Sequence, residues 1–230
     1  MLWQLLTGDV WPEVQAFGLL RLRLPALGAD TVALSAHKLH GPRGAGALWV
    51  RSGVRLQPLW LGGGQERGLR GGTENLPALV GFGRAARLAR QALDAGADAR
   101  VAELRGRLES AAVAAVAPLV PETRPTVADA PRAPHIASLA FPGLPAEPLL
   151  HALEARGVLA SAGSACASRT AGASPTLKAI GLDDRTGVLR FSLSRATTAA
   201  DVDGAVAALA EAVGEVLSGA RPLAIRPAHG

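Results

Sequence analysis

The sequence predicts an α/β protein built from two units, and three observations support this fold class. Short apolar runs bounded by glycine, proline or polar residues indicate buried strands, as at residues 32–34. Apolar residues at helical spacing over 76–93 indicate an amphipathic helix. A stretch with five prolines, 118–134, interrupts the pattern. We therefore expect a first unit of strands and loops over residues 1–85, and a second unit over 86–230 that alternates helices with strands.

The other expected elements follow from the same patterns. They are strands at 47–50, 135–141, 158–160 and 188–193, and helices at 97–116, 145–157, 175–180 and from Thr197 or Thr198 to Leu217. A threonine hydroxyl can accept a hydrogen bond from a free backbone amide at a helix start, and Asp201 places a negative charge in the first turn. The second unit is thus expected to be an α/β or α+β sandwich.

Composition narrows the class of function. The chain has 230 residues, of which 49% are hydrophobic, so it can form a packed core. Its net charge of +5 is scattered, and no basic block interleaved with aromatic residues suggests nucleic-acid binding. Apolar runs are shorter than the roughly 18 residues of a membrane span. A single cysteine, Cys166, excludes an intrachain disulfide, and we expect a cytoplasmic protein.

One lysine lies in a polar turn between the two strands expected at 32–34 and 47–50. The turn runs from Ser35 to Gly46 and holds Lys38. A surface loop with a solvated lysine is one interpretation, because turns of this composition are common. A lysine held in place can also attack a carbonyl and form a Schiff base.

A glycine-rich stretch, Gly62–Asn75, carries six glycines together with two arginines, two glutamates, a glutamine and a threonine. Neither a helix nor a strand tolerates that glycine content, so we expect a loop. Its polar side chains favour an ordered loop over a disordered one, and backbone amides exposed by glycine can bind anions.

Two further residues have both a structural and a chemical interpretation. A lone cysteine is often a small buried hydrophobe. Cys166, however, lies in the small and polar stretch Gly163–Ser168, which suits an accessible nucleophile better than a core strand. Arg190 interrupts the apolar strand expected at 188–193 and needs an anion, which is either a structural carboxylate or the carboxylate of a substrate.

Four motifs in order resemble one family. They are SAHKLHGPRGAGALWVR, GGGQERGLRGGTEN, SAGSACAS and LRFSLSRATTAADVD, and the likeness extends from about Gln15 to Leu217. The chain resembles the cysteine desulfurases, within the class V aminotransferase-like branch of the fold-type I pyridoxal-phosphate enzymes. The resemblance implies an incomplete large domain with part of a mixed, mostly parallel sheet, and a small C-terminal α/β (α+β) domain.

The resemblance also implies a pyridoxal 5'-phosphate site. Lys38 matches the lysine that bonds to this cofactor and then moves protons at the substrate. Ser35 and His37 match residues that bind the cofactor phosphate, and Gln15 matches a glutamine at the pyridine ring. Thr73 matches a threonine that reaches the phosphate of the neighbouring subunit, which implies a homodimer with shared sites.

The implied reaction is the removal of sulfur from L-cysteine to give L-alanine. Cys166 matches the cysteine that takes up the sulfur as a persulfide, and Arg190 matches the arginine that pairs with the substrate carboxylate. The sulfur would pass to an acceptor protein, for iron–sulfur cluster assembly or tRNA thiolation. Two alternatives stay open: another class V aminotransferase or lyase, and an inactive remnant that only dimerises or binds a partner.

The start of the sequence departs from the family. The family places much of the cofactor domain before the lysine strand, and this part is missing. Pro12 stands where the family has an aspartate that pairs with the pyridine nitrogen, and Val10 stands where it has a histidine. We therefore expect an N-terminally truncated chain whose family likeness begins near Gln15.

Overall fold

The computed structural model describes residues 10–11, 17–162, 175–183 and 185–219. The chain divides into two compact units, Met1–Ala97 and Asp98–Gly230. The boundary expected between residues 85 and 86 falls inside the long helix that ends the first unit.

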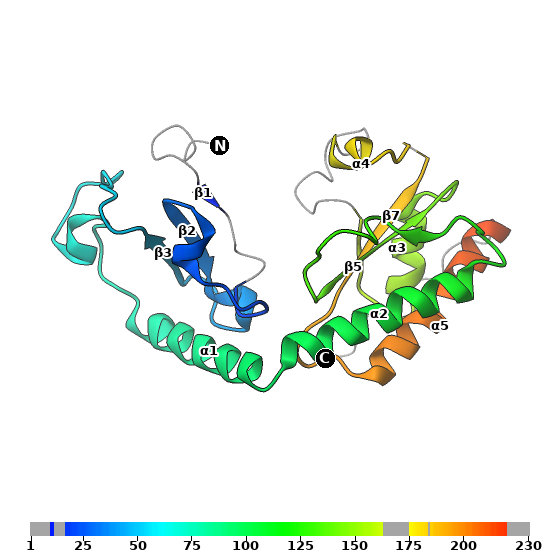
Figure 1. The fold of residues 1–230 in the computed structure, drawn as a ribbon, viewed down its shortest axis with the longest axis horizontal. Coiled ribbons are helices and arrows are strands. Elements are labelled where there is room, and N and C mark those ends of the chain that lie inside the picture. Colours follow the sequence, from blue (N-terminus) through cyan, green and yellow to red (C-terminus); the bar gives the residue numbers. More distant parts are fainter. Residues whose placement is uncertain (1–9, 12–16, 163–174, 184, 220–230) are drawn as a thin grey trace. The chain divides into compact units, whose positions relative to one another are not determined.

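The first unit holds one small mixed sheet and one long helix (Figure 1). Its elements are β1 (Val10–Trp11), η2 (Leu24–Leu27), β2 (Thr31–Ser35), η3 (Ala36–Leu39), β3 (Gly46–Val50), η4 (Gln65–Gly68) and α1 (Leu76–Asp94). Strand β2 is central, pairing parallel with β1 and antiparallel with β3. The strands predicted on either side of the lysine turn and the helix predicted over 76–93 are thereby confirmed.

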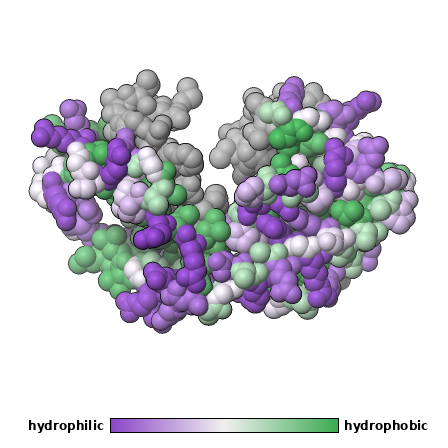
Figure 2. Space-filling view, viewed as in Figure 1, coloured by the Kyte–Doolittle hydropathy of each residue, from purple (hydrophilic) through white to green (hydrophobic). Residues whose placement is uncertain are grey.

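The core of the first unit is small. One buried cluster consists of Ala36, Ala45 and Ala78, with Phe82 packed against it, and the larger side chains of Val32, Leu39 and Leu93 are also buried. Large apolar side chains stay exposed instead, among them Trp60, Leu61, Leu76, Leu79 and Val80. Figure 2 shows the green patch over the first turns of α1. This exposure agrees with the prediction that the first unit is an incomplete domain, because a complete one would cover most of these groups.

The second unit is a four-stranded antiparallel sheet with helices packed on it (Figure 1). Its elements are α2 (Ala97–Val116), β4 (Arg124–Pro125), β5 (Ile136–Phe141), α3 (Ala146–Glu154), β6 (Ser161–Ala162), α4 (Pro175–Ala179), β7 (Gly187–Ser192) and α5 (Ala199–Ser218). The strand order is β4-β5-β7-β6. Helix α5 begins at Thr198, whose side chain and that of Asp201 form a reciprocal capping box, as the threonine–aspartate spacing predicted.

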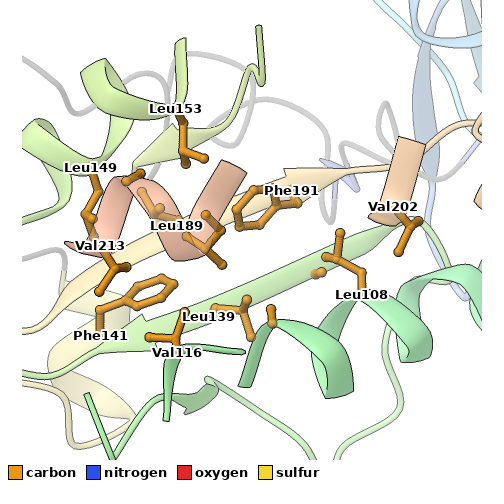
Figure 3. Packing of buried hydrophobic residues seen from close by; sticks show 14 of the residues in the cluster. Leu108, Val116, Leu139, Phe141, Leu149, Leu153, Leu189, Phe191, Val202 and Val213 are labelled. Atoms are coloured by element: carbon orange, nitrogen blue, oxygen red, sulfur yellow. The ribbon is translucent and has the colours of Figure 1, made fainter. Parts of the chain in front are cut away.

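Alternation along the strands separates the two faces of this sheet. Ala137, Leu139 and Phe141 of β5 and Leu189 and Phe191 of β7 enter one large core. Figure 3 shows Leu139, Phe141, Leu189 and Phe191 among residues of α2, α3 and α5, which include Leu108, Val116, Leu149, Val202 and Val213. The other face carries a smaller cluster, in which Leu182 and Leu177 meet Ala140 and Val188. The strand residues between these core positions, such as Ser138 of β5 and Arg190 of β7, therefore face away from the helical core.

One element lies later than predicted. Residues 158–160, where a strand is expected, form no regular secondary structure, and β6 begins at Ser161. The Val158 amide still bonds to the Leu153 carbonyl at the end of α3, and Leu159 is 80% exposed. The first residue to reach β7 is therefore Ser161, which pairs with Arg190. In the part of the chain that the structure describes, no helix has the length and hydropathy of a membrane span.

Candidate functional site

Lys38 lies on a tight turn that β2 and β3 hold in place. The chain leaves β2 at Ser35, forms the single helical turn η3, and enters β3 at Gly46. Ala36 and Leu39 are buried, so the residues between them, His37 and Lys38, face the surface side of the turn. The Ala36 amide donates to the Ala45 carbonyl at 3.0 Å and closes the base of the turn. Lys38 is half-buried and follows directly after His37.

Ser35 and His37 are joined by a hydrogen bond beside Lys38. Ser35 Oγ lies 2.8 Å from His37 Nδ1. Ser35 is half-buried and His37 is exposed, so the imidazole can be reached from solvent. A hydroxyl, an imidazole and an amine within four residues form a donor set that suits an anion such as a phosphate monoester and, at the amine, an aldehyde. The residues present therefore fit the cofactor that the sequence motifs imply.

The glycine-rich stretch Gly62–Asn75 is a loop, as predicted, and it closes on itself. A Cβ built on Gly71 would lie 3.1 Å from the Cα of Gly62, so a larger residue at this position would require the neighbouring backbone to shift by a few tenths of an ångström. Glu66 and Arg67 adopt φ of 49° and 58°, a strained region for residues with side chains. Thr73 is exposed, and Asn75 caps α1 by accepting from the Ala78 amide at 3.2 Å. The start of α1 thus anchors the segment that presents Thr73.

Arg190 lies in the second unit, on the sheet face turned away from the helical core. The strand register aligns it with Ser138 of β5 on one side and Ser161 of β6 on the other. Its Nη2 donates to Ser161 Oγ at 3.4 Å. Its Nε is buried and has no hydrogen-bond partner among the described residues. Among the described residues no carboxylate forms an ion pair with Arg190, and a guanidinium suits an anion such as a carboxylate.

His135 lies just before β5, and the charge of Arg190 affects its pKa. Burial lowers the pKa of His135 below its ordinary value, and the positive charge of Arg190 lowers this pKa further. Its Nδ1 is buried without a partner among the described residues. The neutral imidazole is therefore favoured, and it adds no second cation next to Arg190.

Two of the predicted site residues, Gln15 and Cys166, lie outside the described residues. Within the described residues, the structure brings Ser35, His37 and Lys38 together on one turn. Sequence reasoning missed Ser161 as a partner of Arg190, although Ser161 begins the motif SAGSACAS. Only the strand register reveals this pair, because the two residues are 29 positions apart.

Comparison with known proteins identifies the family. The family model described as Aminotransferase class-V matches residues 12–204, which is most of the chain. The chain therefore belongs to the class-V aminotransferase family, as its motifs predicted.

Named relatives are cysteine desulfurases. The chain is 41% identical to a cysteine desulfurase of Bradyrhizobium diazoefficiens over 211 residues, which is 90% of this chain and 52% of that protein. It is 43% identical to a cysteine desulfurase of Gluconacetobacter diazotrophicus over 192 residues, which is 83% of this chain and 47% of that protein. The chain thus spans about half the length of the curated relatives it matches.

Solved structures share the fold. A NifS-like protein from Rickettsia africae matches with a TM-score of 0.76 and 26% identity, covering 89% of this chain and 53% of that one. A second NifS-like protein matches with a TM-score of 0.73 and 32% identity, covering 88% of this chain and 51% of that one. The prediction of a fold-type I architecture with an incomplete large domain is confirmed.

Proposed function

We propose that this chain carries the lysine, thiol and carboxylate-binding parts of a pyridoxal-phosphate-dependent cysteine desulfurase. The observation that carries the proposal is its 41% identity, over 90% of the chain, to a protein named cysteine desulfurase. The reaction takes the sulfur of L-cysteine to Cys166, so that L-cysteine and a thiol give L-alanine and a persulfide. Atoms balance in this transfer without an external oxidant or reductant.

The first unit supplies the cofactor-binding residues. Ser35 and His37, 2.8 Å apart, offer a hydroxyl and an imidazole to the phosphate group. Lys38 on the same turn supplies the amine that holds the cofactor covalently and then carries protons to and from the substrate. Gln15 and Thr73 are assigned to the pyridine ring and to the phosphate bound in a second subunit. When bound, pyridoxal phosphate supplies an electron sink at the substrate α-carbon.

The second unit supplies the substrate-binding and sulfur-accepting residues. The planar fork of Arg190 suits a bidentate pair with the carboxylate of an amino acid. Its Nε is buried and has no hydrogen-bond partner among the described residues, which supports this role, because a buried donor without a partner is unfavourable until a ligand accepts its hydrogen bond. Cys166, as the thiolate, attacks the sulfur of the bound substrate and keeps it as a persulfide.

Two wider assignments follow from the same proposal. A homodimer is supported by the exposed apolar residues Leu76, Leu79 and Val80 on α1, next to the loop that carries Thr73. A sulfur-acceptor protein, in iron–sulfur cluster assembly or tRNA thiolation, would consume the persulfide. The cytoplasm suits a reaction that needs a reduced thiol.

The test separates the proposal from its two alternatives. Purified chain is mixed with pyridoxal phosphate and reduced with borohydride, and the cofactor adduct is located by mass spectrometry. Because Lys38 and Lys178 are the only lysines, the labelled peptide identifies the site directly. We expect label on Lys38, no label on this peptide in Lys38→Arg, and L-alanine with sulfide when L-cysteine and a reductant are added.

Cys166→Ser separates the desulfurase from other class V chemistry. We expect the adduct on Lys38 to persist and sulfide release to stop. A labelled chain that transaminates L-cysteine without releasing sulfide would support another class V enzyme instead. A chain that takes no label on Lys38 would be an inactive remnant and would refute the proposal.

A further inference from the structure

Three side chains form one row on the sheet face of the second unit that is turned away from the helical core. The register aligns Ser138 of β5 with Arg190 of β7, and Arg190 with Ser161 of β6. Directly paired residues in an antiparallel sheet share a face, so all three point away from the helical core. Arg190 is thus flanked by two hydroxyls, and the hydrogen bond goes to Ser161.

We infer that Ser161 is a positioning residue that orients the Arg190 guanidinium toward an amino-acid carboxylate. The inference rests on the proposed function in taking such a carboxylate as the ligand. It adds a residue that acts through Arg190 and not on the substrate itself.

The donor geometry of arginine explains why one hydroxyl is enough to orient the whole guanidinium. A guanidinium has five N–H donors in one plane, so fixing one nitrogen fixes the direction of the others. Ser161 accepts from Nη2 at 3.4 Å, and Nε stays buried without a partner among the described residues. Without the Ser161 hydroxyl, the long side chain regains rotamers that no longer present a fixed fork to a carboxylate.

Ser161 is held by both its backbone and its side chain. Ser161 begins β6, and Cys166 follows five residues later in the sequence. Backbone pairing with Arg190 and the side-chain bond to Arg190 therefore hold Ser161 in place at the start of β6.

The experiment compares two variants of Ser161 that have the same shape. Ser161→Thr keeps a hydroxyl and Ser161→Val lacks it, and both suit a strand. Calorimetry on the full chain equilibrated with pyridoxal phosphate gives dissociation constants for L-alanine and for L-alaninamide, which lacks the carboxylate. Ser192→Ala is the matched control, because Ser192 is exposed on the same strand and face.

We expect the wild type to prefer L-alanine over L-alaninamide. Ser161→Val should lower this preference by about three- to tenfold, the range of one net hydrogen bond. Ser161→Thr and Ser192→Ala should retain it, and Arg190→Gln should remove it. If Ser161→Val does not unfold cooperatively, Ser161→Ala takes its place in the comparison.

Kinetics provide a second measure and separate this inference from the proposed function. With L-cysteine and its methyl ester as substrates, Ser161→Val should lower kcat/KM for L-cysteine more than for the ester. An equal loss for both, or the same preference in the valine and threonine variants, overturns the inference even where the chain releases sulfide. A carboxylate preference that depends on Ser161, in a chain that releases no sulfide, supports the inference and refutes the proposed function.

Discussion

Substitution of the ion pair between Glu109 and Arg132 tests how the proline-rich connection is held. Arg132 donates through Nη1 to Oε1 of Glu109 at 2.6 Å and through Nη2 to Oε2 at 3.1 Å. The exposed fraction is 18% for the arginine side chain and 8% for the glutamate. Glu109 lies on α2, and Arg132 lies in the segment between β4 and β5. The pair therefore joins the connection to the helical layer.

The two single substitutions should differ in cost. Arg132→Met leaves a nearly buried carboxylate without its partner, which costs about 3–5 kcal/mol of unfolding free energy. Glu109→Gln keeps the shape and one acceptor, and the arginine can turn its charged end to water, so this change costs about 1–2 kcal/mol. The double variant should lose less than the sum of the two, by about 1–3 kcal/mol, because the residues interact directly.

Urea unfolding followed by far-UV circular dichroism measures these differences. All four tryptophans lie before residue 61, so their fluorescence reports on the first unit and provides an internal comparison in the same sample. A larger cost for Glu109→Gln than for Arg132→Met would refute the argument from burial. Additive single costs would refute the direct interaction.

Three further predictions concern helix capping, pH and the glycine-rich loop. Thr198→Ala removes the cap of α5 and should lower the unfolding free energy by about 1 kcal/mol in urea titrations. Hydrogen bonds from the backbone amide of Thr198 and then from its hydroxyl lower the pKa of Asp201, so in the variant this pKa should move back toward its ordinary value in NMR titrations. An unmoved pKa would contradict the capping box. The lowered pKa of His135 contributes stability that is present above its ordinary pKa of about 6.5 and is lost as pH falls through the lowered value. The urea midpoint of His135→Gln should therefore fall less on acidification than that of the wild type. Equal declines in the two proteins would contradict this pH dependence. Gly71→Ala places a Cβ 3.1 Å from a glycine Cα across the loop and should speed tryptic cleavage within the loop at unchanged global stability, whereas equal cleavage rates would show that the loop does not close there.

Most of the fold could be predicted from the sequence because local signals and packing agree. The helix predicted at 97–116 coincides with α2, and the predicted cap at Thr198 begins α5. The strand at 158–160 was wrong because short apolar runs do not show where ladder pairing starts. Pairing depends on the register with β7, which brings Ser161 and not Leu159 opposite its partner. Register is a property of two distant segments, so a pattern in one of them does not contain it.

In the candidate site, too, residues that are close in the sequence could be predicted, and contacts that depend on strand register could not. Ser35, His37 and Lys38 are neighbours in the sequence, and a single turn brings their side chains together, so a motif was enough to find them. Arg190 was found as an anomaly, a charge inside an apolar strand. Its partner Ser161 was not found, because only the sheet pairs residues so far apart. A motif thus identifies the groups that meet a ligand, and the strand register shows which residue holds one of them in position. Substitutions at Ser161 should therefore alter carboxylate preference although Lys38, Cys166 and Arg190 are unchanged.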